Sequence, residues 1–149
     1  MKGTADGVLN HTQSSASEVR YWYNGRESGE IAQTALLADS ADVPVIMVTG
    51  DTATCREAKA FLGAHVVTVA VEKGIAREAA ELYPLQEARQ AIFEGAKKAV
   101  NAIGMCKPYK LRMPLRCRRE WIEHTDRPSE TRVVVREALV RDVTRIYAF

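Results

Sequence analysis

The chain has 149 residues, with 21 Lys and Arg against 19 Asp and Glu, and 46% of its residues are hydrophobic. This length suits one ordinary domain, or a small domain with an appended part, and allows a buried core. The net charge of only +2 produces no global field that favours nucleic acid or a membrane surface, so we expect neither as a partner. No apolar run reaches transmembrane length and no signal-peptide pattern opens the chain. Three cysteines, an odd number without metal-ligand spacing, favour reduced thiols and a cytoplasmic location.

The first part of the chain predicts a loop, a strand and a helix. The loop, residues 7–15, is rich in Ser and Thr and has His11 in its middle. Residues 19–24 are rich in β-forming side chains and run into Asn24-Gly25, a pair typical of tight hairpin turns. A helix follows from Ser28, because apolar residues recur there at helical spacing with Glu30 in the first turn.

Two further strand and helix pairs follow. The predicted strands are residues 43–49 and 65–71, and the predicted helices are residues 52–62 and 84–103. The first of these strands lacks alternation, which predicts burial on both faces. Asp51 and Gly63 are suited to cap the two ends of the first helix. Strands alternating with helices predict an α/β fold with a partly parallel sheet flanked by helices.

The C-terminal part has a different pattern. We predict an α/β core over residues 1–104, which bears His11 and Glu30, and a C-terminal α+β portion over residues 105–149 packed on it. The predicted elements of the second part are strands at residues 110–116, 118–123 and 131–136, a turn at residues 126–129 and a closing helix at residues 138–147.

Polar residues in loops and at strand ends are the candidates for chemistry. A histidine and a carboxylate on two loops, here His11 and Glu30, can meet at one site and bind a metal or move protons. Asp51 ends a strand and opens a helix, where open α/β sheets bind anions, although capping is the commoner role. Lys73 and Arg77 follow the next strand and suit a substrate carboxylate, unless they are simply solvated. Phosphate-loop, HExxH, GxSxG and CxxC motifs are absent from the sequence, so the functions that they mark lack direct support.

Three segments, in the same order, resemble the M55 family of D-aminopeptidases. The matching segments are G-T-A-D-G-V-L-N-H-T at residues 3–12, Asn24-Gly25 followed by Gly29-Glu30, and V-P-V-I-M-V-T-G-D at residues 43–51 followed by Glu57-Ala58. They are similar to the family's G-T-x-x-G-V-[LM]-[SN]-H-[ST], N-G/D-x-x-x-G-E and V-P-V-x-[ML]-V-[TA]-G-D-D segments. The chain departs from the last pattern at Thr52, where the family has a second aspartate.

The resemblance implies a metallopeptidase that removes N-terminal D-amino acids from short peptides, within a ring-shaped homo-oligomer that is decameric in the known case. Such enzymes hold two zinc ions through an Asp-x-Glu, two histidines and the glutamate that matches Glu30. The histidine that matches His11 is catalytic. The remaining ligands have no counterpart here, because His65 and His124 lie in the wrong segments. We therefore expect a truncated form that supplies only part of the zinc ligands and is inactive unless another chain completes it.

Lys73, Arg77 and Asp51 are weaker candidates for substrate binding. Two other functions stay open at this stage. One is a non-catalytic module that keeps the family's oligomerisation surface. The other is a small α/β module that binds an anion or a nucleotide through the Gly50-Asp51 turn with Lys73 and Arg77.

Overall fold

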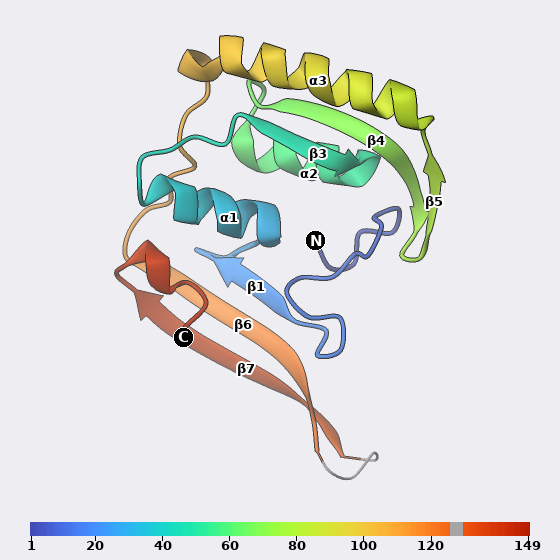
Figure 1. Cartoon of the computed structure of the whole chain (residues 1–149). Coiled ribbons are helices and arrows are strands. Elements are labelled where there is room, and N and C mark those ends of the chain that lie inside the picture. Colours follow the sequence, from blue (N-terminus) through green and yellow to red (C-terminus); the bar gives the residue numbers. More distant parts are fainter. Residues whose placement is uncertain (126–129) are drawn as a thin grey trace.

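The computed structural model describes residues 1–125 and 130–149, and the statements below concern these residues (Figure 1). The helices are α1 (Glu30–Asp39), α2 (Thr52–Leu62) and α3 (Leu85–Asn101), with short 3₁₀ turns at Ile103–Met105 and Val143–Arg145. The strands are β1 (Arg20–Tyr23), β2 (Arg26–Glu27), β3 (Met47–Asp51), β4 (Val67–Ala76), β5 (Ala79–Leu82), β6 (Leu115–His124) and β7 (Thr131–Val140). Within the described part of the chain, no helix is both long and apolar enough to cross a membrane.

The strands form two sheets that share no strand. One is a four-stranded antiparallel sheet in the order β2-β1-β6-β7, and the other is a three-stranded sheet in the order β3-β4-β5. In the second sheet β3 and β4 run parallel, whereas β5 returns antiparallel to β4. The predicted fold class, a partly parallel sheet flanked by helices together with an α+β portion, is confirmed.

The main hydrophobic core lies on one face of the four-stranded sheet. Tyr21 and Tyr23 of β1 pack there with Leu36 of α1, Leu115 of β6 and Ile146 of the C-terminal segment. Tyr23 is fully buried, and its hydroxyl accepts a hydrogen bond from the Gln33 side chain of α1 at 3.1 Å. Helix α1 therefore belongs to the same packing unit as the four-stranded sheet.

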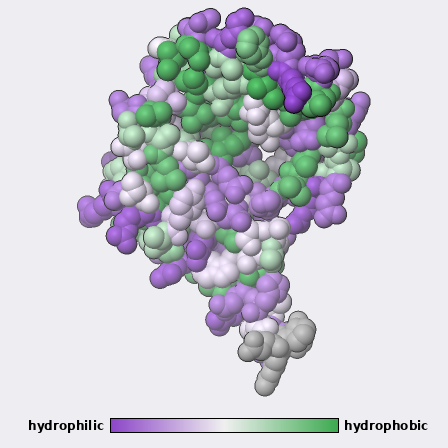
Figure 2. Space-filling view, viewed as in Figure 1, coloured by the Kyte–Doolittle hydropathy of each residue, from purple (hydrophilic) through white to green (hydrophobic). Residues whose placement is uncertain are grey.

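Helices α2 and α3 cover opposite faces of the three-stranded sheet (Figure 1). Gly95 lets α3 approach closely, because a Cβ there would lie 2.5 Å from Val69 Cγ2 of β4. Much of α3 remains exposed, including Leu85, Phe93 and Val100. Figure 2 shows hydrophobic side chains reaching the surface at the end of the molecule that carries this sheet and α3.

Several predicted elements differ from those observed. The strand predicted at residues 43–49 begins only at Met47, and its residues are mostly half-buried because β3 lies at a sheet edge. The first predicted strand, β1, joins the antiparallel sheet instead of the parallel one. Residues 110–116 are mainly a loop that contains a cis Met113–Pro114 bond, and β6 begins at Leu115.

The helix predicted at residues 138–147 is wrong. Its first three residues complete β7, where Ala138 pairs with Cys117 and Val140 pairs with Leu115. Only the 3₁₀ turn Val143–Arg145 follows. Pairing along the full length of β6 supplies backbone hydrogen bonds that outweigh the helical spacing of the apolar residues. The turn predicted at residues 126–129 lies outside the described residues.

The four-stranded sheet takes β1 and β2 from before residue 104 and β6 and β7 from after it. The predicted division of the chain at that residue stays a prediction.

Candidate functional site

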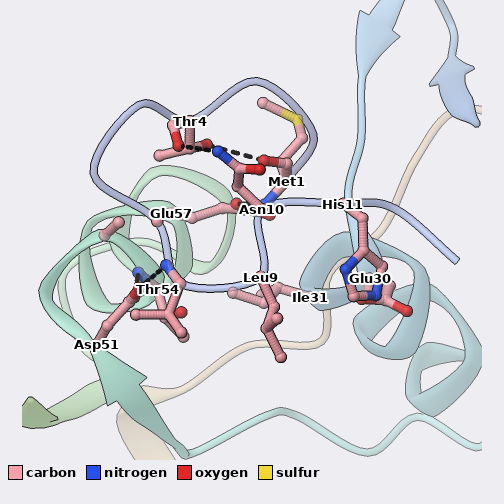
Figure 3. Close-up of a pocket in the computed structure, with 13 residues that line it drawn as sticks. Met1, Thr4, Leu9, Asn10, His11, Glu30, Ile31, Asp51, Thr54 and Glu57 are labelled. Atoms are coloured by element: carbon pink, nitrogen blue, oxygen red, sulfur yellow. Dashed lines mark hydrogen bonds and ion pairs between the residues drawn. The ribbon is translucent and has the colours of Figure 1, made fainter. Parts of the chain in front are cut away.

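A pocket of about 220 Å³ lies between the N-terminal loop, the start of α1 and the first turns of α2. Its lining includes His11, Glu30, Asp51, Thr54 and Glu57. Figure 3 shows His11 projecting from the loop toward the start of α1, where Glu30 lies, and Asp51, Thr54 and Glu57 lying on the α2 side. The structure thus brings His11, Glu30 and Asp51, which are far apart in the sequence, to one cavity.

The loop that carries His11 is held by hydrogen bonds from the three residues that precede this histidine. The Val8 amide donates to Asp51 Oδ2 at 2.7 Å, and the Leu9 amide donates to the carbonyl oxygen of Arg77 at 2.8 Å. The Asn10 side-chain amide donates to the Thr4 carbonyl oxygen at 2.7 Å, which closes the loop on itself. These contacts fix the backbone directly before His11, so the half-buried imidazole extends from a constrained segment.

Glu30 is the first residue of α1 and is exposed at the pocket. The N-cap residue, Gly29, provides no side-chain hydrogen bond to the helix. A carboxylate in the first turn is therefore favourable to the helix by itself, because it complements the partial positive charge of the unpaired amides.

Asp51 caps α2 and has both carboxylate oxygens occupied. Besides the Val8 amide, it accepts the Thr54 amide at 2.6 Å, and it is only 3% exposed. Burial acts to raise the pKa of Asp51, but the hydrogen bonds from the Thr54 and Val8 amides outweigh it and hold that pKa below its usual value. Asp51 therefore caps α2, the role that the sequence favoured for it. It also accepts a hydrogen bond from the loop that carries His11, which the sequence did not predict.

Glu57 lines the pocket and lies in one of the segments that match the family, but it was not predicted as a site residue. It lies two turns along α2 from Asp51, its side chain is 12% exposed, and Oε2 accepts the α-ammonium of Met1 at 2.8 Å. A Cβ at Gly29 would lie 2.6 Å from Glu57 Oε1, so only glycine lets this carboxylate approach the start of α1. The signal was present in the sequence, since residues 51, 54 and 57 share one helix face.

Lys73 and Arg77 do not line this pocket. Lys73 is exposed on β4 opposite Glu81 of β5, and the Arg77 guanidinium lies 3.4 Å from Glu18. The sequence did not predict the β4–β5 hairpin that places both residues. Their role in substrate binding stays a prediction.

The described residues do not complete a zinc site. No group of three or more His, Cys, Asp or Glu side chains among them is arranged to hold a metal ion. His11 and Glu30 supply one imidazole and one carboxylate, while both Asp51 oxygens and Glu57 Oε2 already have partners. A zinc ion in proteins normally takes at least three protein ligands.

Comparison with known proteins agrees with the motifs that converge on this pocket. The sequence model of the M55 peptidase family, described as D-aminopeptidase, matches residues 1–141. The chain belongs to the M55 peptidase family. A D-aminopeptidase of Bacillus subtilis (strain 168) is 32% identical over 108 residues, which cover 72% of this chain and 38% of that protein.

A solved structure shares the M55 fold. It is described as the Zn-dependent D-aminopeptidase DppA from Bacillus subtilis, a self-compartmentalizing protease, and matches with a TM-score of 0.85 and 22% sequence identity. The match covers 99% of this chain and 56% of that chain. The chain thus spans about half or less of the length of the relatives it matches.

Proposed function

We propose that the chain is the part of a D-aminopeptidase-type peptide hydrolase that carries His11 and Glu30. The observation that supports this most directly is the convergence of these two residues, from separate family motifs, on one pocket. The proposed substrates are short peptides with an N-terminal D-amino acid. His11 would move protons at the reacting peptide, and Glu30 would provide one metal ligand.

The family relative with a solved structure is Zn-dependent, but the described residues here supply too few ligands for such an ion. The other ligands of the proposed dinuclear zinc site would therefore come from outside the described residues. Either a second chain or a longer polypeptide can supply them. A bound zinc ion would contribute an activated water to the hydrolysis.

We also propose that the protein assembles into a ring-shaped homo-oligomer. The related protease is described as self-compartmentalizing, and apolar side chains are exposed on α3 and on the edge strand β7, including Phe93 and Val133. Size-exclusion chromatography with light scattering checks this assembly, and a clean monomer at micromolar concentration would contradict it.

A chimera tests the peptidase proposal. The segment of the Bacillus subtilis D-aminopeptidase that precedes its match to this chain would be fused in front of Met1, and the product would be assayed with D- and L-alanine p-nitroanilides. We expect zinc-dependent hydrolysis that prefers the D-substrate and falls at least about 100-fold in His11→Ala, as for loss of a general acid or base. Glu30→Gln should lower the bound zinc, whereas the control His124→Gln should retain both zinc and turnover. A folded chimera that binds zinc but shows no D-selective turnover would refute the proposal.

A further inference from the structure

The buried amide of Gln33 joins the loop that carries His11 to the core of the four-stranded sheet. Gln33 lies on α1, three residues after Glu30, and is fully buried. Its Oε1 accepts the side-chain amide of Gln13 at 2.9 Å, and its Nε2 donates to the Tyr23 hydroxyl at 3.1 Å. One side chain therefore contacts both the core and the loop, two residues after His11.

The direction of this hydrogen-bond chain is fixed at its inner end. The Tyr23 hydroxyl donates to the carbonyl oxygen of Ile146 at 3.3 Å, and a carbonyl oxygen can only accept. Burial raises the pKa of the Tyr23 hydroxyl, so this group keeps the proton that it donates. The Gln33 amide must then turn its nitrogen toward Tyr23, which leaves its oxygen facing the loop. Only a donor at position 13 can satisfy that buried oxygen.

The backbone on both sides of His11 has a conformation that needs support. Leu9 and Gln13 have left-handed φ angles of +48° and +64°, which residues other than glycine rarely adopt. Such conformations persist where the surrounding contacts hold them. The Leu9 amide donates to the Arg77 carbonyl oxygen at 2.8 Å, and the exposed Gln13 is tied to the buried Gln33 through its side chain.

Gln33 is also linked to Glu30 through α1. Residues three apart lie on the same face of a helix, so the two side chains are neighbours. The Gln33 backbone amide donates to the Gly29 carbonyl oxygen at 3.1 Å, directly before Glu30. Figure 3 shows His11 extending from the loop toward this first turn. A side chain that is anchored on the helix and holds the loop therefore limits how far the imidazole can move from Glu30.

We propose that Gln33 is a positioning residue that holds His11 beside Glu30 by way of Gln13. The inference rests on the proposed function, because it concerns how the imidazole is held for proton transfer at that site. Gln33 does not line the pocket, so it acts through the loop and not by contact with a substrate. A misplaced proton-transfer group lowers the rate of the chemical step more than it lowers the binding of substrate.

The test compares three substitutions along this hydrogen-bond chain. Gln13→Met has a similar length but no donor, whereas Gln13→Lys is long enough to bring an ammonium donor to the Gln33 oxygen. Gln33→Met removes both hydrogen bonds of the buried amide. The control is Gln90→Met, since Gln90 is an exposed glutamine of α3 whose side-chain amide donates to Glu94 at 3.1 Å. Because Gln13 is exposed, its two variants keep the test decisive if Gln33→Met fails to fold.

Hydrogen exchange followed by NMR in the 149-residue chain measures opening of the loop. The His11 amide, which donates to the Leu9 carbonyl oxygen at 2.6 Å, reports on the loop, and the amide of Cys117 in β6 reports on the core. We expect His11 exchange to accelerate at least about threefold in Gln13→Met, as for loss of one hydrogen bond, with Cys117 unchanged. Gln33→Met should accelerate His11 exchange at least as much. Gln13→Lys should restore slow exchange, and Gln90→Met should match the unmodified chain.

The chimera described above gives a second readout, which a purely structural role would not change. Gln13→Met should lower kcat about tenfold while KM stays within about twofold, and Gln13→Lys should recover most of kcat. Unchanged His11 exchange in Gln13→Met, or equal effects of Gln13→Met and Gln13→Lys, would overturn the inference. The exchange measurements need neither zinc nor turnover, so an inactive chimera rejects the proposed function and leaves them intact. An active chimera whose kcat is unaffected by Gln13→Met rejects the positioning role alone.

Discussion

The carboxylate of Asp51 accepts the backbone amide of Val8 at 2.7 Å, three residues before His11 in the chain. One side chain therefore both caps α2 and ties the His11 loop to it. The position of the His11 loop and the stability of the first turn of α2 therefore both depend on the Asp51 carboxylate.

Replacing Asp51 with Asn should destabilise the protein by about 1–2 kcal/mol, because one amide oxygen replaces two charged acceptors and one of the two amides loses its partner. Urea unfolding would measure the change. Asp142→Asn is the matched control, since Asp142 caps only an exposed 3₁₀ turn. We expect the control to cost about 0.5 kcal/mol or less. Equal effects of the two substitutions would show that the tie to Val8 contributes nothing.

The lowered pKa of Asp51 predicts a defined acid sensitivity. A carboxyl group with a lower pKa in the folded state stabilises the fold above its unfolded pKa of about 3.9, and that contribution disappears as the pH falls through the folded value. Unfolding free energies measured from pH 6 to pH 2 should therefore fall less steeply below about pH 4 in Asp51→Asn than in the unmodified chain. Identical slopes would contradict this assignment of the pKa shift.

Gly29→Ala should displace Glu57 from the start of α1, because the new methyl group would lie 2.6 Å from Glu57 Oε1. We expect a loss of about 1–3 kcal/mol and shifted amide NMR signals at Met1, Glu30 and Glu57. Gly104→Ala provides the control, since nothing lies within 4 Å of a Cβ at that position. If both variants unfold at the same temperature as the unmodified chain, the close approach has no energetic consequence.

The three cysteines should react with a thiol reagent in a fixed order. Cys117 is fully buried and burial raises its pKa to about 11, so its thiolate is scarce as well as inaccessible. Burial, and then the nearby Asp51 charge, raise the pKa of the Cys55 thiol, which is only half-buried. At pH 8 we expect Cys106 to react first, Cys55 more slowly and Cys117 only on unfolding. Mass spectrometry of partly labelled protein would establish the order, and early labelling of Cys117 would be inconsistent with the core described above.

The 149-residue chain alone should hydrolyse D-amino acid p-nitroanilides at no more than the background rate, because His11 and Glu30 do not by themselves provide the ligands of a zinc site. Turnover with added Zn²⁺, together with elemental analysis of the purified chain, gives the measurement. Robust zinc-dependent hydrolysis that is lost in His11→Ala would instead show that the site is completed by assembly of this chain.

Local signals in the sequence were sufficient to predict several elements of the fold. Helix α2 was predicted at its observed limits because Asp51 and Gly63 are strong capping residues, and Gly63 takes the left-handed φ of +87° at the helix end. The Asn24-Gly25 turn behaves similarly, with positive φ at both residues, as a tight hairpin requires.

Contacts distant in sequence account for what was missed. The sequence predicts a helix over residues 138–147, whereas in the structure residues 138–140 extend β7. The strand is favoured where β6 is available to pair with it, and that depends on folding of the whole sheet. At the site, the family motifs indicated roles for His11 and Glu30, whereas they marked Glu57 only as a matching position in the segment that contains Asp51. Gly29, the N-cap of α1, lies against the Glu57 carboxylate although it is far from Glu57 in the sequence, and this contact helps to bury the carboxylate.

His11 lies at the point where the chain passes from one packing unit to the other. Before it, Val8 and Leu9 are fastened to α2 and to the segment after β4. After it, the Gln13 side chain donates to Gln33 of α1, which packs on the four-stranded sheet and also carries Glu30. A small rotation of one unit against the other would alter the spacing of imidazole and carboxylate while leaving both interiors intact. The distance between these two groups is therefore set by how the two units pack against each other, and not only by the residues that line the pocket.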